Sequence, residues 1–342
     1  MIAAVMRDRK LVVAEVPIPE PGPGEVLVRT LACGICGSDL HALRHADTFV
    51  ATARRAGNPR VMDLGRDVVM GHEFCAEIVE HGPGTTRTLH VGTRVCSRPV
   101  LMRDTGPQTI GYSNDHPGGY GEYMRLCEAL LLEVPSGLPT DHAALTEPMA
   151  VGLHAVAKAG VTPGDTPLVI GCGPVGLAVI AALRLRDVRP IVAADFSPRR
   201  RELAVALGAD VVVDPASTSP WDRWRETAGT RPAVVFECVG VPGVLDQLMA
   251  AAPRNARIVV VGVCMEPDTI YPMLGIVKEL NLQFVLGYTQ EEFAATLGHI
   301  ADGRISVAPL ITGHVGIDGV AGAFEALASP ERHAKILVRA AG

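Results

Sequence analysis

The sequence has no apolar run long enough to cross a membrane. Apolar stretches such as residues 129–132 and 258–264 are far shorter than the roughly 20 residues that a spanning helix needs. The apolar start of the chain passes directly into Arg7, Asp8, Arg9 and Lys10, which is unlike the layout of a secretion signal. We therefore expect a cytoplasmic protein without a membrane segment.

An excess of positive charge is also missing. The chain has 31 Lys and Arg against 37 Asp and Glu, for a formal net charge of −6, and its arginine clusters at 54–55 and 199–201 are local. This pattern offers no electrostatic footprint for nucleic acid. Internal repeats and low-complexity segments are absent, and a composition of 48% hydrophobic and 20% charged residues is typical of a folded globular protein.

The eight cysteines do not have the regular spacing of a disulfide framework. In a long chain without a secretion signal, we expect them to be thiols. They lie at positions 33, 36, 75, 96, 127, 172, 238 and 264.

The first part of the chain predicts a turn-rich β domain. A length of 342 residues suits two domains of roughly 150 residues each. Residues 1–32 alternate short β-branched runs with Pro-Gly turns. Residues 42–70 are polar and Arg-rich, and we interpret them as a long, partly helical excursion. Further strands are expected at 77–80, 93–96 and 124–126, with a loop over 97–117.

From about residue 143 the pattern changes to alternating helices and strands. A helical pattern covers 143–159, and short apolar strands then alternate with helical stretches, which implies a doubly wound parallel sheet. The end of the chain is expected to return to the first domain, with helices at 290–301 and 319–328 and a strand at 335–339. The expected strands of the parallel sheet are 168–170, 191–194, 211–213, 234–236, 258–261 and 282–286, and the expected helices are 174–186, 198–207, 220–228 and 243–252.

A glycine fingerprint lies between the first strand of this sheet and the next helix. Residues 171–176 read Gly171-Cys172-Gly173-Pro174-Val175-Gly176. In this context the first glycine permits the tight turn, the second lets the backbone approach a pyrophosphate, and the third lets the helix pack on the strand. The helix amino terminus then meets the phosphate charge with unpaired N–H groups. The sequence therefore predicts a dinucleotide site in an α/β domain over residues 147–288, beside a β-rich domain over residues 1–146 and 289–342.

Asp195 ends the second strand, 19 residues after Gly176. An acidic side chain at this distance accepts hydrogen bonds from the ribose hydroxyls of NAD and repels the 2′-phosphate of NADP. The alternative interpretations are NADP, whose phosphate the arginines at 199–201 could accommodate, and a surface aspartate that caps the helix starting at Ser197-Pro198. We favour NAD.

Possible metal ligands are gathered in three short motifs. Gly34-Ile35-Cys36-Gly37-Ser38-Asp39-Leu40-His41 combines a soft ligand, a hydroxyl and an imidazole, although Cys36 could also be a buried small hydrophobe. His72, Glu73 and Glu147 add an imidazole and two carboxylates, which together with a thiolate suit a catalytic zinc. Adjacent strand residues point to opposite faces, so His72 and Glu73 can share one metal only if the chain bends at Gly71.

At these residues the sequence resembles the medium-chain, zinc-dependent alcohol dehydrogenases, in particular the branch of the sorbitol and threonine dehydrogenases. The resemblance spans nearly the whole chain in the family's order. It implies a GroES-like β-rich catalytic domain and a Rossmann NAD-binding domain. The matching segments are 34–41, 71–73, 118–123, 146–154, 171–176 and 236–240.

The resemblance also implies roles for individual residues. Cys36, His72 and Glu73 correspond to zinc ligands, and Glu147 to a fourth ligand or to the partner of a bound water. The positions of Ser38 and His41 relay the substrate proton to solvent through the nicotinamide ribose, and Asp39 orients a ligand or the loop. The cofactor would be held by the fingerprint, by Arg200 together with Asp195 at the adenine ribose, and by backbone groups near Val239, Val263 and Leu286 to Tyr288.

Two departures from the family bear on function. Many relatives hold a structural zinc with four closely spaced cysteines, but only Cys96 and Cys127 lie between residues 90 and 130. We therefore expect one catalytic zinc and no structural zinc. The gap between Cys36 and His72 is longer than usual, and the surplus falls in residues 42–70, close to where substrate should enter.

The sequence thus predicts a zinc-dependent oxidoreductase that moves a hydride between NAD and an alcohol, a polyol or an amino alcohol. Zinc would lower the pKa of the substrate hydroxyl, and Ser38 would accept the proton. The alternatives are a zinc-free quinone or enone reductase on the same fold and an inactive cofactor-binding protein. A redox pair of Cys33 and Cys36 is disfavoured, because the thioredoxin-like context is missing. The resemblance also implies a homodimer or homotetramer.

Overall fold

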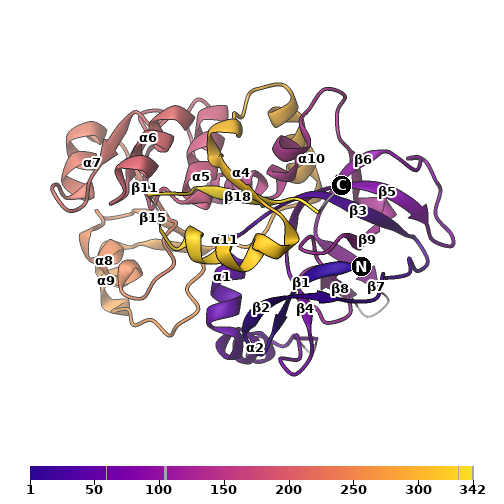
Figure 1. Ribbon diagram of the computed structural model, residues 1–342. Helices are drawn as coiled ribbons and strands as arrows, with labels where there is room; N and C mark the ends of the chain where they lie inside the picture. The colour runs from indigo at the N-terminus through magenta and orange to yellow at the C-terminus, as the bar shows by residue number, and fades with distance from the viewer. Residues whose placement is uncertain (59, 104–105, 330, 341–342) are drawn as a thin grey trace. The chain divides into compact units, whose positions relative to one another are not determined.

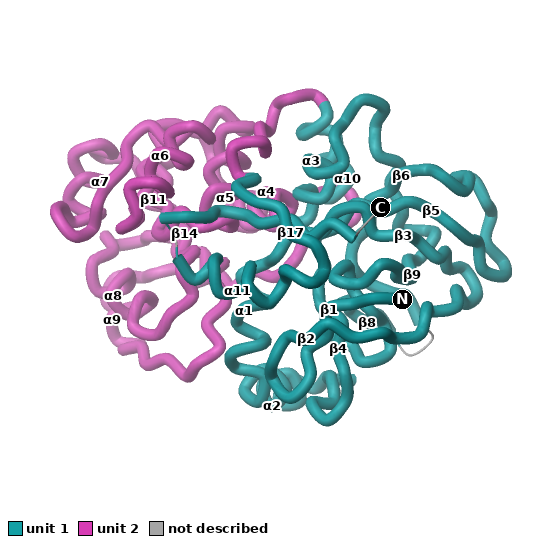
Figure 2. Tube along the Cα trace, in the orientation of Figure 1, with its two compact units in different colours: residues 1–147, 293–301, 311–342 teal, residues 148–292, 302–310 magenta. Residues whose placement is uncertain are grey.

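The computed structural model describes residues 1–342 apart from 59, 104–105, 330 and 341–342. The chain forms two compact units (Figure 2): unit 1 comprises residues 1–147, 293–301 and 311–342, and unit 2 comprises residues 148–292 and 302–310. Residues 302–310, which we expected in the first domain, thus belong to unit 2. Among the described residues, no helix is long and apolar enough to cross a membrane.

Unit 1 is built mainly of strands (Figure 1). They are β1 (Ile2–Arg7), β2 (Lys10–Glu15), β3 (Glu25–Gly34), β4 (Val68–Val69), β5 (Glu73–His81), β6 (Arg94–Ser97), β7 (Val100–Arg103), β8 (Gly106–Thr109), β9 (Tyr123–Cys127), β10 (Leu131–Glu133), β17 (Ile311–Val315) and β18 (Lys335–Val338). The helices of this unit are α1 (Gly37–Arg44), α2 (Ala46–Arg55), α3 (Thr140–Ala144) and α11 (Val320–Leu327). Short 3₁₀ turns cover Glu128–Leu130 and Ile317–Gly319 in this unit and Ala308–Leu310 in unit 2.

The largest sheet of unit 1 has the strand order β10-β6-β5-β3-β18-β17, with β9 also paired to β3. A second sheet has the order β2-β1-β4, and β7 pairs with β8. Strands β3 and β5 are mostly apolar and buried, as a central strand pair requires. The late strand β18 pairs with the end of β3, where Leu337 lies opposite Gly34 and Val338 opposite Cys33. This pairing brings the end of the chain to the residues just before Cys36.

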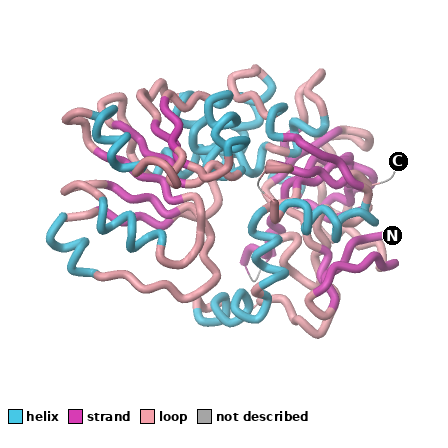
Figure 3. Tube along the Cα trace, turned by 60° about the vertical axis from the view of Figure 1, so that its left-hand side comes forward, coloured by secondary structure: helices cyan, strands magenta, loops and turns pink. Residues whose placement is uncertain are grey.

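Unit 2 contains a six-stranded parallel sheet flanked by helices (Figure 3). Its strands are β11 (Thr166–Ile170), β12 (Val192–Ala194), β13 (Val211–Val213), β14 (Ala233–Glu237), β15 (Arg257–Val260) and β16 (Asn281–Phe284), and its helices are α5 (Pro174–Leu185), α6 (Pro198–Leu207), α7 (Pro220–Ala228), α8 (Val244–Ala251) and α9 (Pro272–Lys278). The strand order is β13-β12-β11-β14-β15-β16. The order reverses between β11 and β14, which is where doubly wound sheets bind ligands. The predicted fold class is confirmed.

Several predicted elements differ from the observed ones. The expected loop at 97–117 contains the β7–β8 hairpin, although residues 104–105 of that segment lie outside the described residues. Strand β17 and helix α9 were not predicted. The single helix expected at 143–159 is two helices, α3 and α4 (Thr146–Lys158), because Pro148 has no N–H to donate to the preceding turn. Helix α10 (Gln290–Ala301) agrees with its expected range.

Candidate metal centre and dinucleotide site

Cys36 lies at the junction between β3 and α1. Its backbone is extended, with φ −87° and ψ 148°, and it precedes the first residue of the helix. The Asp39 carboxylate accepts a hydrogen bond from the Cys36 N–H at 3.3 Å, which satisfies one of the free donors at the start of the helix. The thiol is thus held at a junction that two regular elements define.

His72 and Glu73 follow a bend at Gly71. Gly71 has a φ of +98°, and a Cβ atom there would lie 2.7 Å from the ring of Tyr120, so both the conformation and the space require glycine. Glu73 begins β5, while His72 is still outside the strand. The predicted bend is therefore confirmed, and the two adjacent side chains reach the same place.

Cys36, His72 and Glu73 come together in unit 1. Each offers one ligand atom, and these atoms all lie within 4.8 Å of one another. A thiolate, an imidazole and a carboxylate, each at about 2.0–2.3 Å from an ion, are the usual ligands of zinc. His72 and Glu73 are buried and Cys36 is half-buried. The donor set and the spacing thus fit a zinc ion.

The protonation of Cys36 and His72 depends on the charged side chains next to them. Burial raises the pKa of the Cys36 thiol, the Glu73 charge adds to this effect, and the neighbouring His72 opposes it. Burial alone would lower the pKa of His72, but Asp39 and Cys36 raise it well above its usual value. The Asp39 Oδ1 lies 3.3 Å from the His72 Nδ1, which is the position of a carboxylate that orients a metal-binding imidazole.

Lys335 neutralises the Glu73 carboxylate. Its Nζ donates to both carboxylate oxygens at 2.8 Å and to the Ile35 carbonyl at 3.0 Å, and the lysine is 1% exposed. Burial by itself would lower the pKa of Lys335, but Glu73 and Cys36 raise it, with a smaller contribution from Glu147. Glu73 therefore faces both a cation of the protein and the candidate metal position.

Glu147 is not part of the group of three. It is buried in the first turn of α4, and its charge contributes to the raised pKa of Lys335. Among the described residues, only Cys36, His72 and Glu73 form a set of ligand atoms with metal-like spacing. The structure thus gives Glu147 a place near the buried lysine but does not bring it into this set.

Ser38 and His41 lie on α1, three residues apart, which places them on one side of the helix. The Ser38 hydroxyl contacts the Cys36 Sγ at 3.1 Å. His41 is half-buried, its ring stacks on His45 with 6.3 Å between centroids, and burial followed by the charges of His45 and Arg44 lowers its pKa. One of the two predicted relay residues therefore touches the metal group.

In unit 2, the glycine fingerprint forms the turn from β11 to α5. Gly171 has a φ of +90°, and a Cβ atom at Gly176 would lie 1.9 Å from the Gly171 carbonyl oxygen. A Cβ atom at Gly173 would meet nothing within 4 Å, and no side chain caps the helix that starts at Pro174. A helix start without a side-chain cap leaves the N–H groups of its first turn, including that of Val175, suited to bind a pyrophosphate.

Asp195 follows β12 and holds the fingerprint loop. Its carboxylate accepts the Cys172 N–H at 2.7 Å and the Ser197 N–H at 2.8 Å, and it lies 3.8 Å from the Arg200 Nη1. A carboxylate has about four acceptor sites, so two remain for ribose hydroxyls. The Nε of Arg200 is buried without a hydrogen-bond partner.

The neighbouring arginines are engaged elsewhere. Arg199 pairs with Glu202 at 3.3 Å. Arg201 donates to the Asp195 and Phe196 carbonyls and lies 3.5 Å from Asp214.

The remaining predicted cofactor residues follow three neighbouring strands. Val239 comes after β14, Val263 after β15 and Leu286 after β16, at the edge of the sheet that also carries the fingerprint. All three side chains are exposed. The buried Glu237 accepts the N–H groups of Val239 and Gly240 at 2.7 and 2.9 Å, which fixes this loop.

Comparison with known proteins matches two parts of the chain to families of dehydrogenases. Residues 22–136 match the model of the alcohol dehydrogenase GroES-like domain, and residues 174–302 match that of the zinc-binding dehydrogenases. The chain is 34% identical to (R,R)-butanediol dehydrogenase of Bacillus subtilis over 94% of both chains. It belongs to the medium-chain zinc-binding alcohol dehydrogenase family.

Other members of this family extend the comparison. Sorbitol dehydrogenase of Gallus gallus is 30% identical over 90% of this chain and 88% of its own. The crystal structure of 2R,3R-butanediol dehydrogenase from Bacillus subtilis superposes with a TM-score of 0.84 at 31% identity over 99% of both chains. An Escherichia coli CFT073 alcohol dehydrogenase complexed with NADH does so with a TM-score of 0.84 at 26% identity, again over 99% of both.

Three residues around the metal group of this dehydrogenase were missed from the sequence. Lys335 neutralises Glu73, Tyr112 donates to Asp39 at 2.8 Å, and Tyr120 donates to the same carboxylate at 2.6 Å. The one available signal was Lys335, a lysine that starts an otherwise apolar strand in a chain with only four lysines. The tyrosines occur in a glycine-rich loop whose path the sequence does not reveal.

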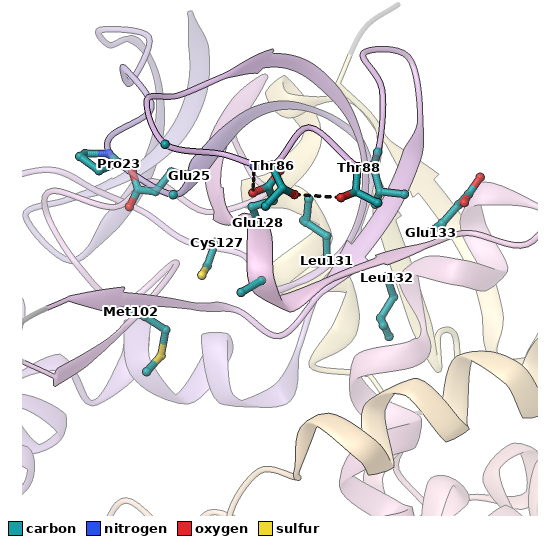
Figure 4. Close-up of a pocket in the computed structure, with 14 residues that line it drawn as sticks. Pro23, Glu25, Thr86, Thr88, Met102, Cys127, Glu128, Leu131, Leu132 and Glu133 are labelled. Atoms are coloured by element: carbon teal, nitrogen blue, oxygen red, sulfur yellow. Dashed lines mark hydrogen bonds between the residues drawn. The ribbon is translucent and has the colours of Figure 1, made fainter.

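A large groove of the dehydrogenase lies away from these residues. It has a volume of about 700 Å³ and is lined by parts of 23–25, 84–89 and 127–133 and by Met102 (Figure 4). Within it, Glu128 accepts the Thr86 N–H at 2.7 Å. None of the candidate metal ligands lines this groove, and we assign it no part in the reaction.

Proposed function

We propose that this chain catalyses the reversible transfer of a hydride between a small alcohol, polyol or amino alcohol and NAD, with zinc as its metal. The observation that carries the proposal is the convergence of Cys36, His72 and Glu73 in unit 1, beside the Ser38 hydroxyl. Unit 2 supports it with an uncapped helix start behind the glycine turn. The activities of the butanediol and sorbitol dehydrogenases agree with this reaction class.

The proposed ligands of the zinc are Cys36, His72 and Glu73. When bound, zinc acts as a Lewis acid and lowers the pKa of a coordinated hydroxyl. The Asp39 carboxylate lies next to the His72 Nδ1 and orients the imidazole ring. Glu147 is proposed as the partner of a water at this site, because its carboxylate is buried nearby without joining the three ligands.

Ser38 is proposed to accept the proton of the substrate hydroxyl, and His41 to pass it to solvent. His41 is half-buried and its pKa is lowered by burial, so a neutral imidazole is available to take up a proton. General acid–base groups of this kind contribute about 10²- to 10⁴-fold to a rate. Both residues come from α1, directly after Cys36.

The cofactor is proposed to be NAD, with NADP disfavoured. The Asp195 carboxylate lies where a 2′-phosphate would be repelled, and Arg199 and Arg201 are paired with Glu202 and Asp214. Arg200 remains to accompany Asp195 at the ribose. Val239, Val263 and Leu286 are proposed to hold the nicotinamide at the edge of the sheet.

The test combines metal analysis with turnover. Purified protein should contain zinc by mass spectrometry and should form NADH from a panel of alcohols and polyols. Cys36→Ser should lose the metal and the turnover while calorimetry shows unchanged NAD affinity; the control is the exposed Cys264→Ser. Turnover of quinones or enones without zinc would support the zinc-free reductase, and zinc-replete protein that turns over nothing in the panel would support an inactive binding protein.

Self-association and a cytoplasmic location also belong to the proposal. The edge strand β16, the preceding α9 and the residue before α9 expose several apolar side chains, which supports pairing of two copies at this sheet edge. These side chains are Tyr271, Met273, Ile276, Val277 and Phe284. All eight cysteines are free thiols, which agrees with a reducing compartment.

A further inference from the structure

We propose that Tyr112 is a positioning residue that sets the direction of the Ser38 hydroxyl, so that Ser38 meets the substrate as a hydrogen-bond acceptor. The inference rests on the proposed function, in which Ser38 takes the substrate proton. It is carried by one chain of contacts: the Tyr112 OH lies 2.8 Å from the Asp39 Oδ1 and 2.9 Å from the Ser38 Oγ.

The first step concerns the hydrogen of Tyr112. The Asp39 carboxylate is fully buried and also faces the Tyr120 hydroxyl at 2.6 Å and the Cys36 N–H at 3.3 Å. All of these neighbours are donors, so the carboxylate acts only as an acceptor. A tyrosine hydroxyl has one hydrogen, and Tyr112 therefore donates it to Asp39. Its oxygen remains an acceptor.

The second step concerns the hydrogen of Ser38. A serine hydroxyl also has one hydrogen and two acceptor lone pairs. Among the described residues, two acceptors lie within reach of Ser38, the Tyr112 oxygen at 2.9 Å and the Cys36 sulfur at 3.1 Å. The Tyr112 contact is the shorter one, and the sulfur shares its lone-pair density with the metal once Cys36 is a ligand. Before the reaction the hydrogen thus points toward Tyr112, and it leaves toward His41 when the substrate proton arrives on the Ser38 oxygen. The lone pairs are left for a substrate hydroxyl.

The third step concerns how Tyr112 is held. Gly111 has a φ of +83°, and a Cβ atom there would lie 2.9 Å from the Gly71 carbonyl oxygen, so the two turns pack backbone to backbone. The Tyr112 ring lies beside His72, with 5.3 Å between centroids, and beside Phe49, with 5.4 Å between centroids. Phe49 belongs to α2, within the unusually long segment 42–70, which thus supports the site.

The test is a double-mutant cycle. Tyr112→Phe keeps the ring and removes the hydroxyl, and Ser38→Ala removes the group on which it acts. We expect kcat to fall about 10²-fold in Ser38→Ala and about tenfold in Tyr112→Phe, with KM little changed. If Tyr112 acts through Ser38, the double variant should equal Ser38→Ala within about a factor of two.

The control is Tyr120→Phe, which removes the other hydroxyl on Asp39. The Tyr120 hydroxyl has no described contact with Ser38. Combining Tyr120→Phe with Ser38→Ala should therefore lower kcat by the product of the two separate reductions. Zinc content and the thermal unfolding of metal-free protein are measured for every variant. Tyr112→Phe should keep its zinc and remain folded; loss of zinc in this variant would assign Tyr112 to the metal site and overturn the inference.

The outcomes separate the two proposals. The wild type could contain zinc and be active while the double variant lowers kcat by the product of the Tyr112→Phe and Ser38→Ala reductions. This result would overturn the role of Tyr112 and leave the proposed function intact. A Tyr112→Phe variant with unchanged kcat would do the same. Wild-type protein that neither holds zinc nor forms NADH would overturn both.

Discussion

At the scale of single residues, the metal group depends on charges that only the fold brings together. Lys335 lies 262 positions from Glu73 in the chain, yet its ammonium contacts both carboxylate oxygens. Sequence reasoning identified Cys36, His72 and Glu73 because their residue types and the bend at Gly71 are local features. It missed Lys335 because no local pattern encodes a contact made when two distant strands pair.

Removing Lys335 should destabilise the protein strongly. In Lys335→Met the Glu73 carboxylate loses its cation, and a buried charge left unpaired costs about 3–5 kcal/mol. Urea unfolding of metal-free protein measures the loss. The control, Lys158→Met at an exposed position, should change the unfolding free energy by less than about 0.5 kcal/mol. Equal stability of the two variants would contradict the contact.

Asp165 should contribute a pH dependence in acid. Burial alone would raise the pKa of Asp165, but hydrogen bonds from Arg257 and the Thr162 N–H lower it overall. Because the folded pKa is below the unfolded value of about 3.9, the stabilisation is present above that pH and is lost as pH falls through the folded pKa. Asp165→Asn should therefore be less stable at neutral pH and lose less stability on acidification.

The measurement for Asp165 is urea unfolding from neutral pH down to the acid limit of the native state. The difference between wild type and Asp165→Asn should shrink as pH falls. Asp302→Asn, at an exposed position, serves as the control. A difference that stays constant with pH would show that the lost contact is not an ionic one.

At the scale of elements, the β7–β8 hairpin is tied to β3 and β9 by an ion cluster around the buried Glu25. The Glu25 carboxylate at the start of β3 lies 2.7 Å from Arg103 of β7 and 3.7 Å from Arg125 of β9, while Arg125 also contacts His116. The hairpin was not predicted because β8 begins with glycine and proline, which are typical of loops.

Glu25→Gln should loosen this hairpin before the rest of unit 1. Two partly exposed arginines lose the charge of their common carboxylate, which costs local stability, although less than the loss of a fully buried pair. Hydrogen exchange followed by mass spectrometry should show faster exchange in β7 and β8 than in β5. Glu15→Gln, at an exposed position of β2, should leave all three strands unchanged. Uniform acceleration across unit 1 would contradict a local role.

At the scale of the whole molecule, the sequence predicted the parallel sheet well and the β-rich unit less completely. The six strands of unit 2 are short apolar runs between helical patterns, and all six were predicted. Unit 1 depends on pairings between distant strands, such as β18 with β3, which a single sequence does not reveal. Residues 302–310 belong to unit 2, but nothing in their composition distinguishes them from the flanking segments of unit 1.

A substitution at the β16 edge should test self-association. Phe284 is 62% exposed on a strand with only one neighbour. Phe284→Lys introduces a charge at the proposed pairing edge and should shift the protein toward monomers in sedimentation velocity experiments. Val91→Lys, which changes an exposed valine of unit 1, should leave the sedimentation unchanged. An unchanged oligomeric state would show that the interface does not lie at the β16 edge.

The position of β18 also has a consequence for biosynthesis. During translation, Glu73 emerges long before Lys335, so a growing chain holds this carboxylate without its counterion until β18 has been synthesised. Until then the end of β3 also lacks the strand that covers it, and an open strand edge invites pairing with other chains. Nascent chains interrupted before residue 335 should therefore need chaperones, because the end of β3 stays uncovered and Glu73 stays without the Lys335 cation.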